Sequence, residues 1–502
     1  MSERTFGQIM RGNCEIDPQG RAMELEGQWY DWDFLAETID EIEAIFHQYR
    51  VPLGAEIAVV CRNRPHPVAA FCAVICGQRC ATPVSPFSSP EKLVADISEL
   101  EAAVVIASAS DWQSQALQSY ASANEILGIC LHEDLSKAHV AVLPFREESV
   151  PVSGAKERPG VAVLIQSSGT TGKPKRIPIY ADKLSAAYSN IPAGVTTSGG
   201  AKIKSKPALI TQPLVHIGGL FWIVHSLLDA RPLSLLEKFA VDPWAAAVEK
   251  YEIRVCSLVP AMINMVLDSP LAAEKLQSLI CIRSGTAPLA VEAQAAFEKR
   301  FQVPILPTYG ATEFSGAVCG WTLDTKKEFG DRKAGSVGRA YPGVDLRVVD
   351  GDSGAELSAG EIGILEVRSD QMADARDWVA TTDLASIDVD GFVWLTGRAD
   401  AAINRGGFKI IPTEVAAMLE KNPQVREASV VGIEDARLGQ VPVAAVELVD
   451  SATDVSQDAL RSWAKDNMTS YFVPVRIAIV DSLPRTPSMK VSQADVKRLF
   501  AS

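Results

Sequence analysis

Ten consecutive residues combine glycine, hydroxyl and lysine side chains in a pattern that suits an anion. The segment Gln166-Ser-Ser-Gly-Thr-Thr-Gly-Lys-Pro-Lys175 follows an apolar run that we expect to be a strand. Glycine lets successive backbone amides turn toward one anion, hydroxyls add donors, and lysine adds positive charge. The segment therefore predicts phosphate binding, although an ordinary polar turn has the same composition. It is not a Walker A loop, because Gly169 and Gly172 are too close together and Pro174 follows Lys173.

A second segment, Tyr309-Gly-Ala-Thr-Glu313, has side chains that a bound nucleotide can use. An aromatic ring can stack on a base, a threonine hydroxyl can donate to a phosphate, and glutamate offers the oxygen ligands that Mg²⁺ prefers. Alone, the pentapeptide fits a buried tyrosine beside a surface glutamate equally well. Nucleotide binding is thus a hypothesis that other segments must support.

The composition excludes some partners. The chain has 502 residues, with 48 Lys plus Arg against 62 Asp plus Glu, a net charge of −14. Nucleic-acid binding needs clustered cations, so we expect no nucleic-acid partner. Small anions remain possible, because local amides and one or two cations hold them.

Targeting signals and metal motifs are weak. The N-terminus lacks a basic run before an apolar core, and the most apolar early stretch, residues 67–75, is too short to span a bilayer. Cys72, Cys76 and Cys80 have helical spacing that could hold a metal, but their apolar neighbours favour a packed helix. We predict no membrane span and a cytoplasmic protein.

The first part of the chain alternates strand-like and helix-like segments, which predicts βαβ units and largely parallel sheets. The expected strands are residues 56–61, 102–107, 161–165, 208–211, 254–258 and 280–283. The expected helices are residues 65–77, 91–100 and 289–301.

The pattern of predicted elements changes twice in the rest of the chain. After about residue 334, frequent glycines separate short alternating strands such as 345–349 and 364–367, which predicts antiparallel hairpins in a small barrel-like subdomain. Beyond Gly397-Arg-Ala-Asp400 we expect a small α/β domain on a short hinge. Its expected helices are residues 413–420, 457–465 and one opened by Ser492, and its expected strands are 428–432, 443–448 and 476–480. The predicted fold class is α/β: a large N-terminal domain of parallel-rich sheets with the barrel-like subdomain, then a small mobile C-terminal domain.

Several segments, taken in order along nearly the whole chain, resemble the motifs of the adenylate-forming superfamily. This superfamily includes acyl-CoA synthetases, coumarate-CoA ligases, luciferases and the adenylation domains of peptide synthetases. The matching segments are the loop at 167–175, Ser284-Gly-Thr-Ala-Pro288, Tyr309-Gly-Ala-Thr-Glu313, Thr381-Thr-Asp383, Gly397-Arg-Ala-Asp400, Arg405-Gly-Gly-Phe-Lys-Ile-Ile-Pro-Thr-Glu414 and Pro484-Arg-Thr-Pro-Ser-Met-Lys490.

The resemblance implies two half-reactions that use ATP, Mg²⁺ and CoA. A carboxylate attacks the α-phosphorus of ATP, giving an acyl-adenylate and pyrophosphate, and the CoA thiol then displaces AMP. The implied domains are 1–397 and 398–502, with a hinge near Asp400. Rotation about the hinge presents first Lys490 and then Gly406 and Gly407, which flank the CoA channel.

The resemblance also assigns site residues. It implies catalytic roles for Lys490, Glu313 and Thr170, with Glu313 as the metal ligand. The implied ATP or AMP contacts are Ser167, Ser168, Gly169, Thr170, Thr171, Gly172, Lys175, Gly285, Thr286, Ala287, Thr308, Tyr309, Gly310, Thr312, Asp383, Arg398 and Lys490.

The resemblance places the acyl pocket around residues 213–222 and implies that His216 is a gate, although a core histidine is the alternative. The expected pocket residues are His216, Gly218, Phe221, Gly285 and Thr308. We expect Gly218, Gly219 and Gly285 to leave room for a ring or chain, with Phe221 and Trp222 lining it. The segment has no Asp to pair with an α-ammonium group, so an apolar aliphatic or aryl monocarboxylate is predicted rather than an amino acid.

Two other functions use the same residues. A stand-alone adenylation enzyme would load a carrier protein instead of CoA, and a nucleotide sensor would perform no reaction. CoA needs cations for its 3′-phosphate; the candidates, which could equally be solvated surface residues, are Lys202, Lys204, Lys206, Arg405 and Lys409. A monomer and a homodimer both remain open.

Three positions depart from the superfamily pattern, each placing another residue where glycine is common: Arg176, Thr382 and Met489. If the backbone at 382 needs a positive φ, threonine should tolerate it less well than glycine. None of the three departures removes a charged or liganding side chain.

Overall fold

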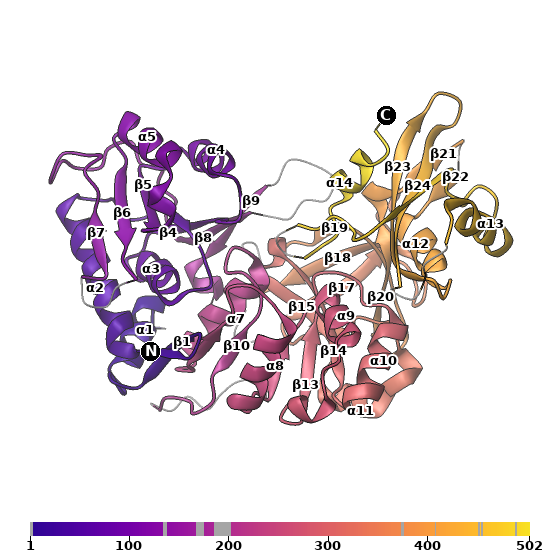
Figure 1. The fold of residues 1–502 in the computed structure, drawn as a ribbon, viewed down its shortest axis with the longest axis horizontal. Coiled ribbons are helices and arrows are strands. Elements are labelled where there is room, and N and C mark those ends of the chain that lie inside the picture. The colour runs from indigo at the N-terminus through magenta and orange to yellow at the C-terminus, as the bar shows by residue number, and fades with distance from the viewer. Residues whose placement is uncertain are drawn as a thin grey trace.

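The computed structural model describes residues 4–133, 138–166, 175–184, 202–372, 376–406, 408–449, 452, 455–486 and 489–501. The described residues form five sheets, four in a large N-terminal domain and one in a smaller C-terminal domain (Figure 1). The predicted α/β class with a large and a small domain is confirmed. None of the described helices combines the length and apolar character needed to cross a membrane.

A seven-stranded sheet occupies the N-terminal part of the large domain, in the order β7-β6-β5-β3-β4-β8-β9. Its interior pairs are parallel, as predicted, and the edge strands β7 and β9 are antiparallel. The strands are β3 Glu56–Val60, β4 Cys80–Val84, β5 Val104–Ser108, β6 Leu127–Leu131, β7 Val140–Val142, β8 Val161–Gln166 and β9 Arg176–Tyr180.

Helices cover both faces of this sheet, which explains its continuous apolar strands. Ile57 and Val59 of β3 belong to the core beneath α1–α3, while Ala58 and Val60 belong to the core beneath α4 and α5. Cys72 is buried within the first core. The helices are α1 Phe6–Cys14, α2 Trp32–Gln48, α3 Pro65–Cys76, α4 Pro90–Leu100 and α5 Gln115–Ala123.

Two further sheets continue the large domain. One has the order β10-β11-β1-β2 and joins the start of the chain to residues 233–235; the other has the order β12-β13-β14-β15-β16. The strands are β1 Arg21–Leu25, β2 Gln28–Asp31, β10 Ala208–Ile210, β11 Leu233–Leu235, β12 Val255–Ser257, β13 Cys281–Ser284, β14 Ile305–Ala311, β15 Gly316–Gly320 and β16 Arg339–Ala340. The helices are α7 Ile217–Leu228, α8 Val241–Lys250, α9 Pro260–Asp268, α10 Val291–Phe301 and α11 Leu323–Phe329.

The glycine-rich stretch after residue 334 forms the predicted antiparallel hairpins. Its four strands pair in sequence order, which makes a meander. They are β17 Val344–Val349, β18 Gly363–Ser369, β19 Val379–Ile387 and β20 Val393–Arg398.

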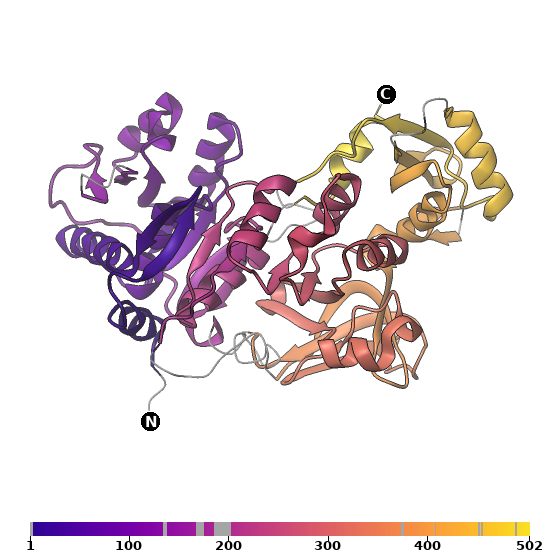
Figure 2. The same ribbon diagram turned by 60° about the horizontal axis from the view of Figure 1, so that its bottom comes forward.

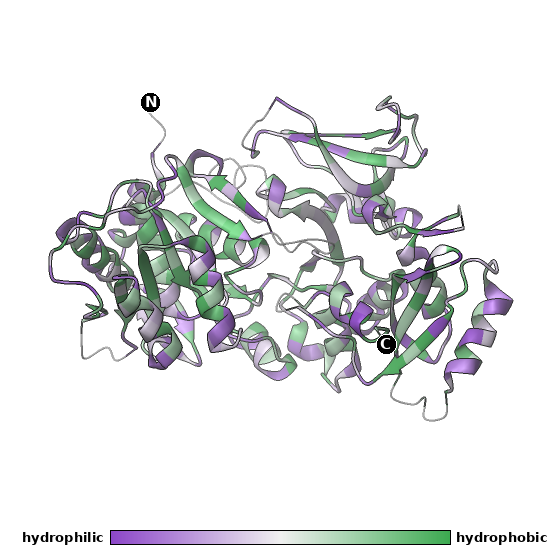
Figure 3. Ribbon diagram, turned by 90° about the horizontal axis from the view of Figure 1, so that it is seen from above, coloured by the Kyte–Doolittle hydropathy of each residue, from purple (hydrophilic) through white to green (hydrophobic). Residues whose placement is uncertain are grey.

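The C-terminal domain has its own apolar core, built from residues such as Ile410, Leu419 and Val446, and it projects from the large domain (Figure 2). Hydropathy follows this division: apolar residues line the strands of both domains, whereas the outer helix α13 is mostly hydrophilic (Figure 3). The elements are β21 Ile403–Arg405, β22 Phe408–Ile410, α12 Pro412–Glu420, β23 Val425–Asp435, β24 Gly439–Leu448, α13 Gln457–Asn467, β25 Arg476–Val480 and α14 Gln493–Arg498.

Candidate active site

An aromatic ring, a carboxylate and a guanidinium meet where two sheets of the large domain adjoin. Tyr309 on β14 donates a hydrogen bond to Asp383 Oδ2 on β19 at 2.5 Å. Asp383 pairs in register with Arg398 on β20. Burial raises the pKa of Tyr309, and the Asp383 carboxylate raises it further, so the phenol remains a donor at neutral pH. Three segments distant in sequence thus converge.

Arg398 is held in a defined position by its neighbours. Its Nε and Nη2 donate to the two carboxylate oxygens of Asp400 at 2.8 Å each, and Nη2 also donates to Thr382 Oγ1 at 2.6 Å. Burial lowers the pKa of Arg398, but the hydrogen bond and charge of Asp400 outweigh burial and raise it overall. Thr382 lies within β19, so its backbone is extended and threonine suits the position. This departure from glycine adds a hydrogen bond to Arg398.

Lys490 comes from the C-terminal domain and lies near this group. Burial lowers the pKa of Lys490, and the positive charge of Arg398 lowers it further. Glu313 and Asp383 oppose that shift. Burial also lowers the pKa of His216 to about 4, with Lys490 as the second cause, so His216 is neutral at pH 7. The ammonium group therefore lies within electrostatic range of all four residues.

Glu313 has the chemistry that a magnesium ion needs. Its side chain is exposed in the short helix η3 Thr312–Phe314. The described part of the chain contains no group of three His, Cys, Asp or Glu side chains that could hold a metal ion. Mg²⁺ commonly takes only one or two protein carboxylates, with phosphates and waters as its other ligands. A single exposed carboxylate near Lys490 fits such an ion.

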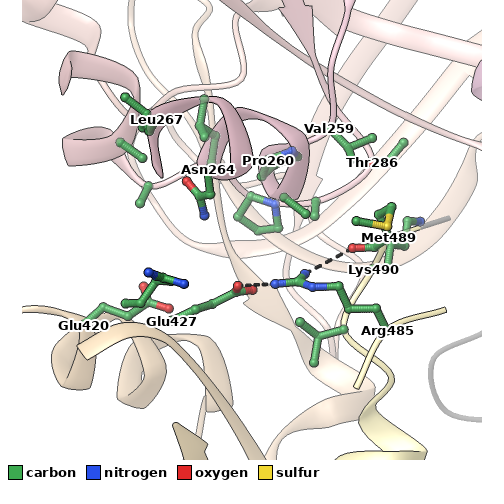
Figure 4. A pocket seen from close by; sticks show the side chains of 18 of the residues that line it. Val259, Pro260, Asn264, Leu267, Thr286, Glu420, Glu427, Arg485, Met489 and Lys490 are labelled. Carbon is green, nitrogen blue, oxygen red and sulfur yellow. Dashed lines mark hydrogen bonds and ion pairs between the residues drawn. The ribbon is translucent and has the colours of Figure 1, made fainter. Parts of the chain in front are cut away.

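Contacts between the domains surround a cavity of about 200 Å³ beside Lys490 (Figure 4). Arg426 of the C-terminal domain lies 3.7 Å from Asp268 at the end of α9. Arg485 pairs with Glu427 and donates through Nη1 to the backbone oxygen of Met489 at 3.2 Å. These contacts support the segment that carries Lys490.

Met489 keeps the backbone conformation that favours glycine. Its φ is +64°, a left-handed value that costs a non-glycine residue about 1–2 kcal/mol. Its side chain packs against the apolar core of the large domain formed by α9 and α10. Apolar contact across the domain boundary therefore offsets local backbone strain.

Glu420 lines the same interdomain cavity, and its titration provides a test of how the two domains pack in this structure. Burial raises the pKa of Glu420 to about 7, and Glu427 and Glu292 raise it too, while a hydrogen bond from the Ala428 amide opposes the shift. An acid whose folded pKa exceeds its ordinary 4.5 destabilises the protein progressively as pH rises from about 4.5 to 7. Glu420→Gln should therefore raise the free energy of unfolding by about 1–3 kcal/mol at pH 8 and change it little at pH 4.5.

Urea unfolding curves of both proteins at the two pH values measure this effect. Glu414→Gln on the exposed face of α12 is the matched control and should change the free energy of unfolding by less than about 0.5 kcal/mol, as is usual for a surface substitution. An equal effect of Glu420→Gln at both pH values would contradict the account.

A second cavity, of about 110 Å³, lies between α7 and the face of β12–β15. Four of the predicted acyl-pocket residues line it together: Gly218, Phe221, Gly285 and Thr308. His216, predicted as a pocket residue, does not line this cavity; it occupies the N-cap position of α7 without a side-chain capping hydrogen bond, within electrostatic range of Lys490. Its Nε2 has no hydrogen-bond partner among the described residues.

The pocket glycines are required mainly by protein atoms. A Cβ at Gly219 would lie 2.2 Å from the Pro213 backbone oxygen, and one at Gly218 would lie 2.0 Å from Gln212 Oε1. At Gly285 it would lie 2.8 Å from Thr308 Oγ1. The expectation that these glycines simply leave room for substrate is therefore incomplete, because backbone atoms already exclude a side chain at Gly219, whereas at Gly218 the Gln212 side chain would have to move.

The structure adds four polar lining residues that sequence reasoning missed: Gln212, Ser257, Arg283 and Tyr341. A charged residue inside a predicted buried strand was an available signal for Arg283. Tyr341 follows the short strand β16, and no local pattern marks it.

Part of the predicted phosphate loop, Ser167, Ser168, Gly169, Thr170, Thr171 and Gly172, lies outside the described residues, as does Gly407. The flanking strands β8 and β9 pair antiparallel, with Gln166 opposite Arg176, and Lys175 directly precedes β9. Thr286 and Ala287 line the interdomain cavity with Lys490. Gly310 lines the second cavity, and Thr312 is buried.

The predicted CoA contacts lie in two separate parts of the structure, near β10 and on the β21–β22 hairpin (Figure 1). Gly406 is in the turn between β21 and β22, which lies on the outer side of the C-terminal domain (Figure 1). Lys204 and Lys206 precede β10 and pair with carboxylates at 3.7 and 2.7 Å. Arg405 donates to backbone oxygens, and Lys409 is exposed on β22. The lysines near β10 and the cations of the hairpin do not form one patch here.

Comparisons with known proteins agree with this architecture. A family model described as AMP-binding enzyme matches residues 11–375, and one described as AMP-binding enzyme C-terminal domain matches residues 414–490. Indoleacetate–CoA ligase of Aromatoleum aromaticum is 32% identical over 354 residues, covering 68% of this chain and 67% of that protein. 4-Coumarate:CoA ligase 1 of Petunia hybrida is 26% identical over 465 residues, covering 89% and 84%.

The fold has a solved counterpart as well. The crystal structure of ATP-bound MatB from Rhodopseudomonas palustris superimposes with a TM-score of 0.81 at 22% identity, covering 98% of each chain. The chain thus belongs to the AMP-binding enzymes, the adenylate-forming superfamily that its motifs resemble.

Proposed function

We propose that the chain is an AMP-forming acyl-CoA synthetase. It activates a carboxylic acid with ATP to an acyl-adenylate and transfers the acyl group to the thiol of CoA. The observation that carries the proposal is the position of Lys490, which reaches from the C-terminal domain into the electrostatic surroundings of Glu313, Asp383 and Arg398. A lysine placed there can serve the first half-reaction.

Adenylation brings two anions together, so the site has to offset their repulsion. Lys490 binds the attacking carboxylate and the α-phosphate and stabilises the charge that grows between them. Asp383, oriented by Tyr309, accepts hydrogen bonds from the ribose hydroxyls, and Arg398 lies beside it. Mg²⁺ bound through Glu313 would supply further positive charge at the phosphates.

Thioester formation needs a second arrangement of the domains. The β21–β22 turn with Gly406 lies away from the site while Lys490 is close to it (Figure 1). We place the hinge at Asp400, between β20 and β21, and the domain boundary at residue 398. Because the Asp400 carboxylate binds Arg398, rotation of the C-terminal domain has to break that ion pair or move both residues together.

The pocket supports an acid with an aliphatic or aryl body. Phe221, Trp222 and Ala317 supply apolar surface, and the relatives compared above are named for the aryl acids 4-coumarate and indoleacetate. CoA as acceptor is supported by the names of these ligases. A carrier-protein thiol is the alternative acceptor.

A panel of carboxylic acids with ATP, Mg²⁺ and CoA, scored for AMP release and for thioester mass, tests the proposal. We expect equal amounts of AMP and acyl-CoA with at least one acid. Acid-dependent pyrophosphate release with no CoA thioester would support carrier loading. Nucleotide binding without release of AMP or pyrophosphate for any acid would refute both activities.

A further inference from the structure

One wall of the acyl pocket carries a charged side chain that the reaction described above does not use. Arg283 lies on β13, in the interior of a sheet, and it lines the 110 Å³ cavity. Much of the remaining lining is apolar or small: Ile217, Gly218, Phe221, Trp222, Gly285, Gly310, Gly316 and Ala317. A fixed positive charge in such a pocket needs an explanation.

Few protein groups accept hydrogen bonds from the N–H donors of this guanidinium. Arg283 Nη1 donates to Tyr341 Oη at 3.2 Å, and this neutral hydroxyl is its one side-chain hydrogen-bond partner in the described residues. Its Nε is enclosed without a hydrogen-bond partner, and no described Asp or Glu side chain lies within 4 Å. An arginine has five N–H donors, so most of this donor capacity is unused.

Some other partly buried arginines of the chain are neutralised; Arg300 and Arg339 also have no described carboxylate partner, but unlike Arg283 they do not line this pocket. Arg62 pairs with Asp111 and Glu237, and Arg347 pairs with Glu366 at 2.7 Å. A partly buried charge without a counter-ion is costly, and an anion entering the pocket would remove that cost. Arg283 is therefore poised for an anionic group that comes with the ligand.

Two neighbouring side chains also offer hydrogen-bond donors to an anionic ligand. Tyr341 accepts from Arg283, so its own hydroxyl hydrogen remains available to a ligand. Ser257 lies beside Arg283 in register on β12, and it accepts from Gln212 Nε2 at 2.9 Å, which likewise leaves its hydroxyl hydrogen available. A guanidinium and two hydroxyl hydrogens make a wall of donors. An ionised carboxylate, which only accepts, is its natural complement.

We propose that the acid activated by this enzyme carries a second carboxylate and that Arg283, assisted by Tyr341, binds it. The proposal rests on the proposed function and names its substrate class. The second carboxylate occupies the pocket while the first faces Lys490; Thr286 lines both this pocket and the cavity beside Lys490. The apolar body predicted from the sequence is kept, but its description as a monocarboxylate is replaced.

Matched acids test the proposal. Adipate, its monoamide and hexanoate form one series; 2-carboxyphenylacetate and phenylacetate form another. For each acid, kcat/KM is measured from acid-dependent exchange of pyrophosphate into ATP. In at least one series, kcat/KM of the wild-type enzyme should be about 10- to 100-fold higher for the dicarboxylate than for the acids that lack the second charge, as expected for a charge-assisted pair.

Variants assign the preference to Arg283. Arg283→Met should abolish the preference while retaining exchange with the monocarboxylate, and Arg283→Lys should retain part of it. Tyr341→Phe should reduce the preference a few-fold without removing the charge, and it serves as the test if Arg283→Met does not fold. Arg347→Met, which removes an arginine paired with Glu366 outside the pocket, should leave the preference unchanged.

The outcomes separate the two proposals. Exchange with monocarboxylates and no preference for a second carboxylate would overturn the role of Arg283 and leave the synthetase intact. Equal use of the dicarboxylate and its counterparts in both series would show that the second charge is not recognised, and a preference that survives in Arg283→Met would assign it elsewhere; either would overturn the proposal. No exchange with any acid would refute the proposed function and this inference together.

Discussion

Replacing Lys490 with alanine is expected to slow acyl-adenylate formation by about 10²- to 10³-fold, the effect of removing one group that stabilises transition-state charge. The ammonium group lies near Glu313, Asp383 and Arg398, where the α-phosphate and the attacking carboxylate are proposed to meet. Thioester formation from supplied acyl-adenylate should stay within a few-fold of wild type, because the second half-reaction is proposed to use the β21–β22 turn instead. Single-turnover assays of each half-reaction measure the two rates.

Lys497→Ala is the matched control for this experiment. Lys497 is an exposed lysine on α14 of the same domain, and both half-reactions should be unaffected by its loss. An equal loss of both half-reactions in Lys490→Ala would contradict the two arrangements of the domains. Full adenylation activity in Lys490→Ala would contradict the role of the lysine itself.

Asp383→Asn is expected to lower kcat/KM for ATP by about 10- to 100-fold. The substitution keeps the size of the side chain but removes the charge that would strengthen the proposed hydrogen bonds from the ribose hydroxyls, and hydrogen bonds to charged groups are worth about 1.5–3 kcal/mol. It also weakens the hydrogen bond that orients Tyr309. Pyrophosphate exchange at varied ATP concentrations, with the acid held saturating, measures the effect.

Asp390→Asn controls for a general loss of stability. Asp390 lies in the turn between β19 and β20 and pairs with Lys333, away from the nucleotide contacts. Its substitution should leave kcat/KM for ATP within about twofold. If Asp383→Asn changed only the apparent affinity for the acid, the ribose assignment would be wrong.

The repeating units of the fold could be predicted because local patterns determine them. The strands at 56–60 and 161–166 are short apolar runs, and both lie in the seven-stranded sheet, where each pairs parallel with β4. β4 was missed because its sequence, Cys80-Ala-Thr-Pro-Val84, includes proline and few β-branched residues, although it lies between β3 and β8. The pairing of β1 with β11 joins residues about 200 positions apart, so no local pattern reports it.

The site residues likewise include some that local sequence patterns identify and some that they do not. Tyr309, Asp383 and Arg398 lie in recognisable segments, and the structure brings the three together. Arg283 and Tyr341 could not be paired from sequence, because their contact depends on how β13 and the segment after β16 pack in three dimensions. A strand residue reveals which face it occupies only through its register, which here places Arg283 beside Ser257.

The departures from the superfamily pattern have different physical explanations. Thr382 lies in extended backbone, so the concern about positive φ does not apply, and its hydroxyl binds Arg398. Met489 does have a positive φ, and its side chain contacts the core of the large domain. Sequence alone could not distinguish these cases, because it does not report φ.

The central claim is that a carboxylate oxygen attacks the α-phosphorus of ATP. An acid from the panel, labelled with ¹⁸O in its carboxylate, tests this directly when turned over with ATP, Mg²⁺ and CoA. The carboxylate oxygen that bonds to phosphorus leaves with AMP when the thiol displaces it, so mass spectrometry should find one ¹⁸O in each AMP. Unlabelled AMP, or turnover to ADP with label in inorganic phosphate, would contradict the account.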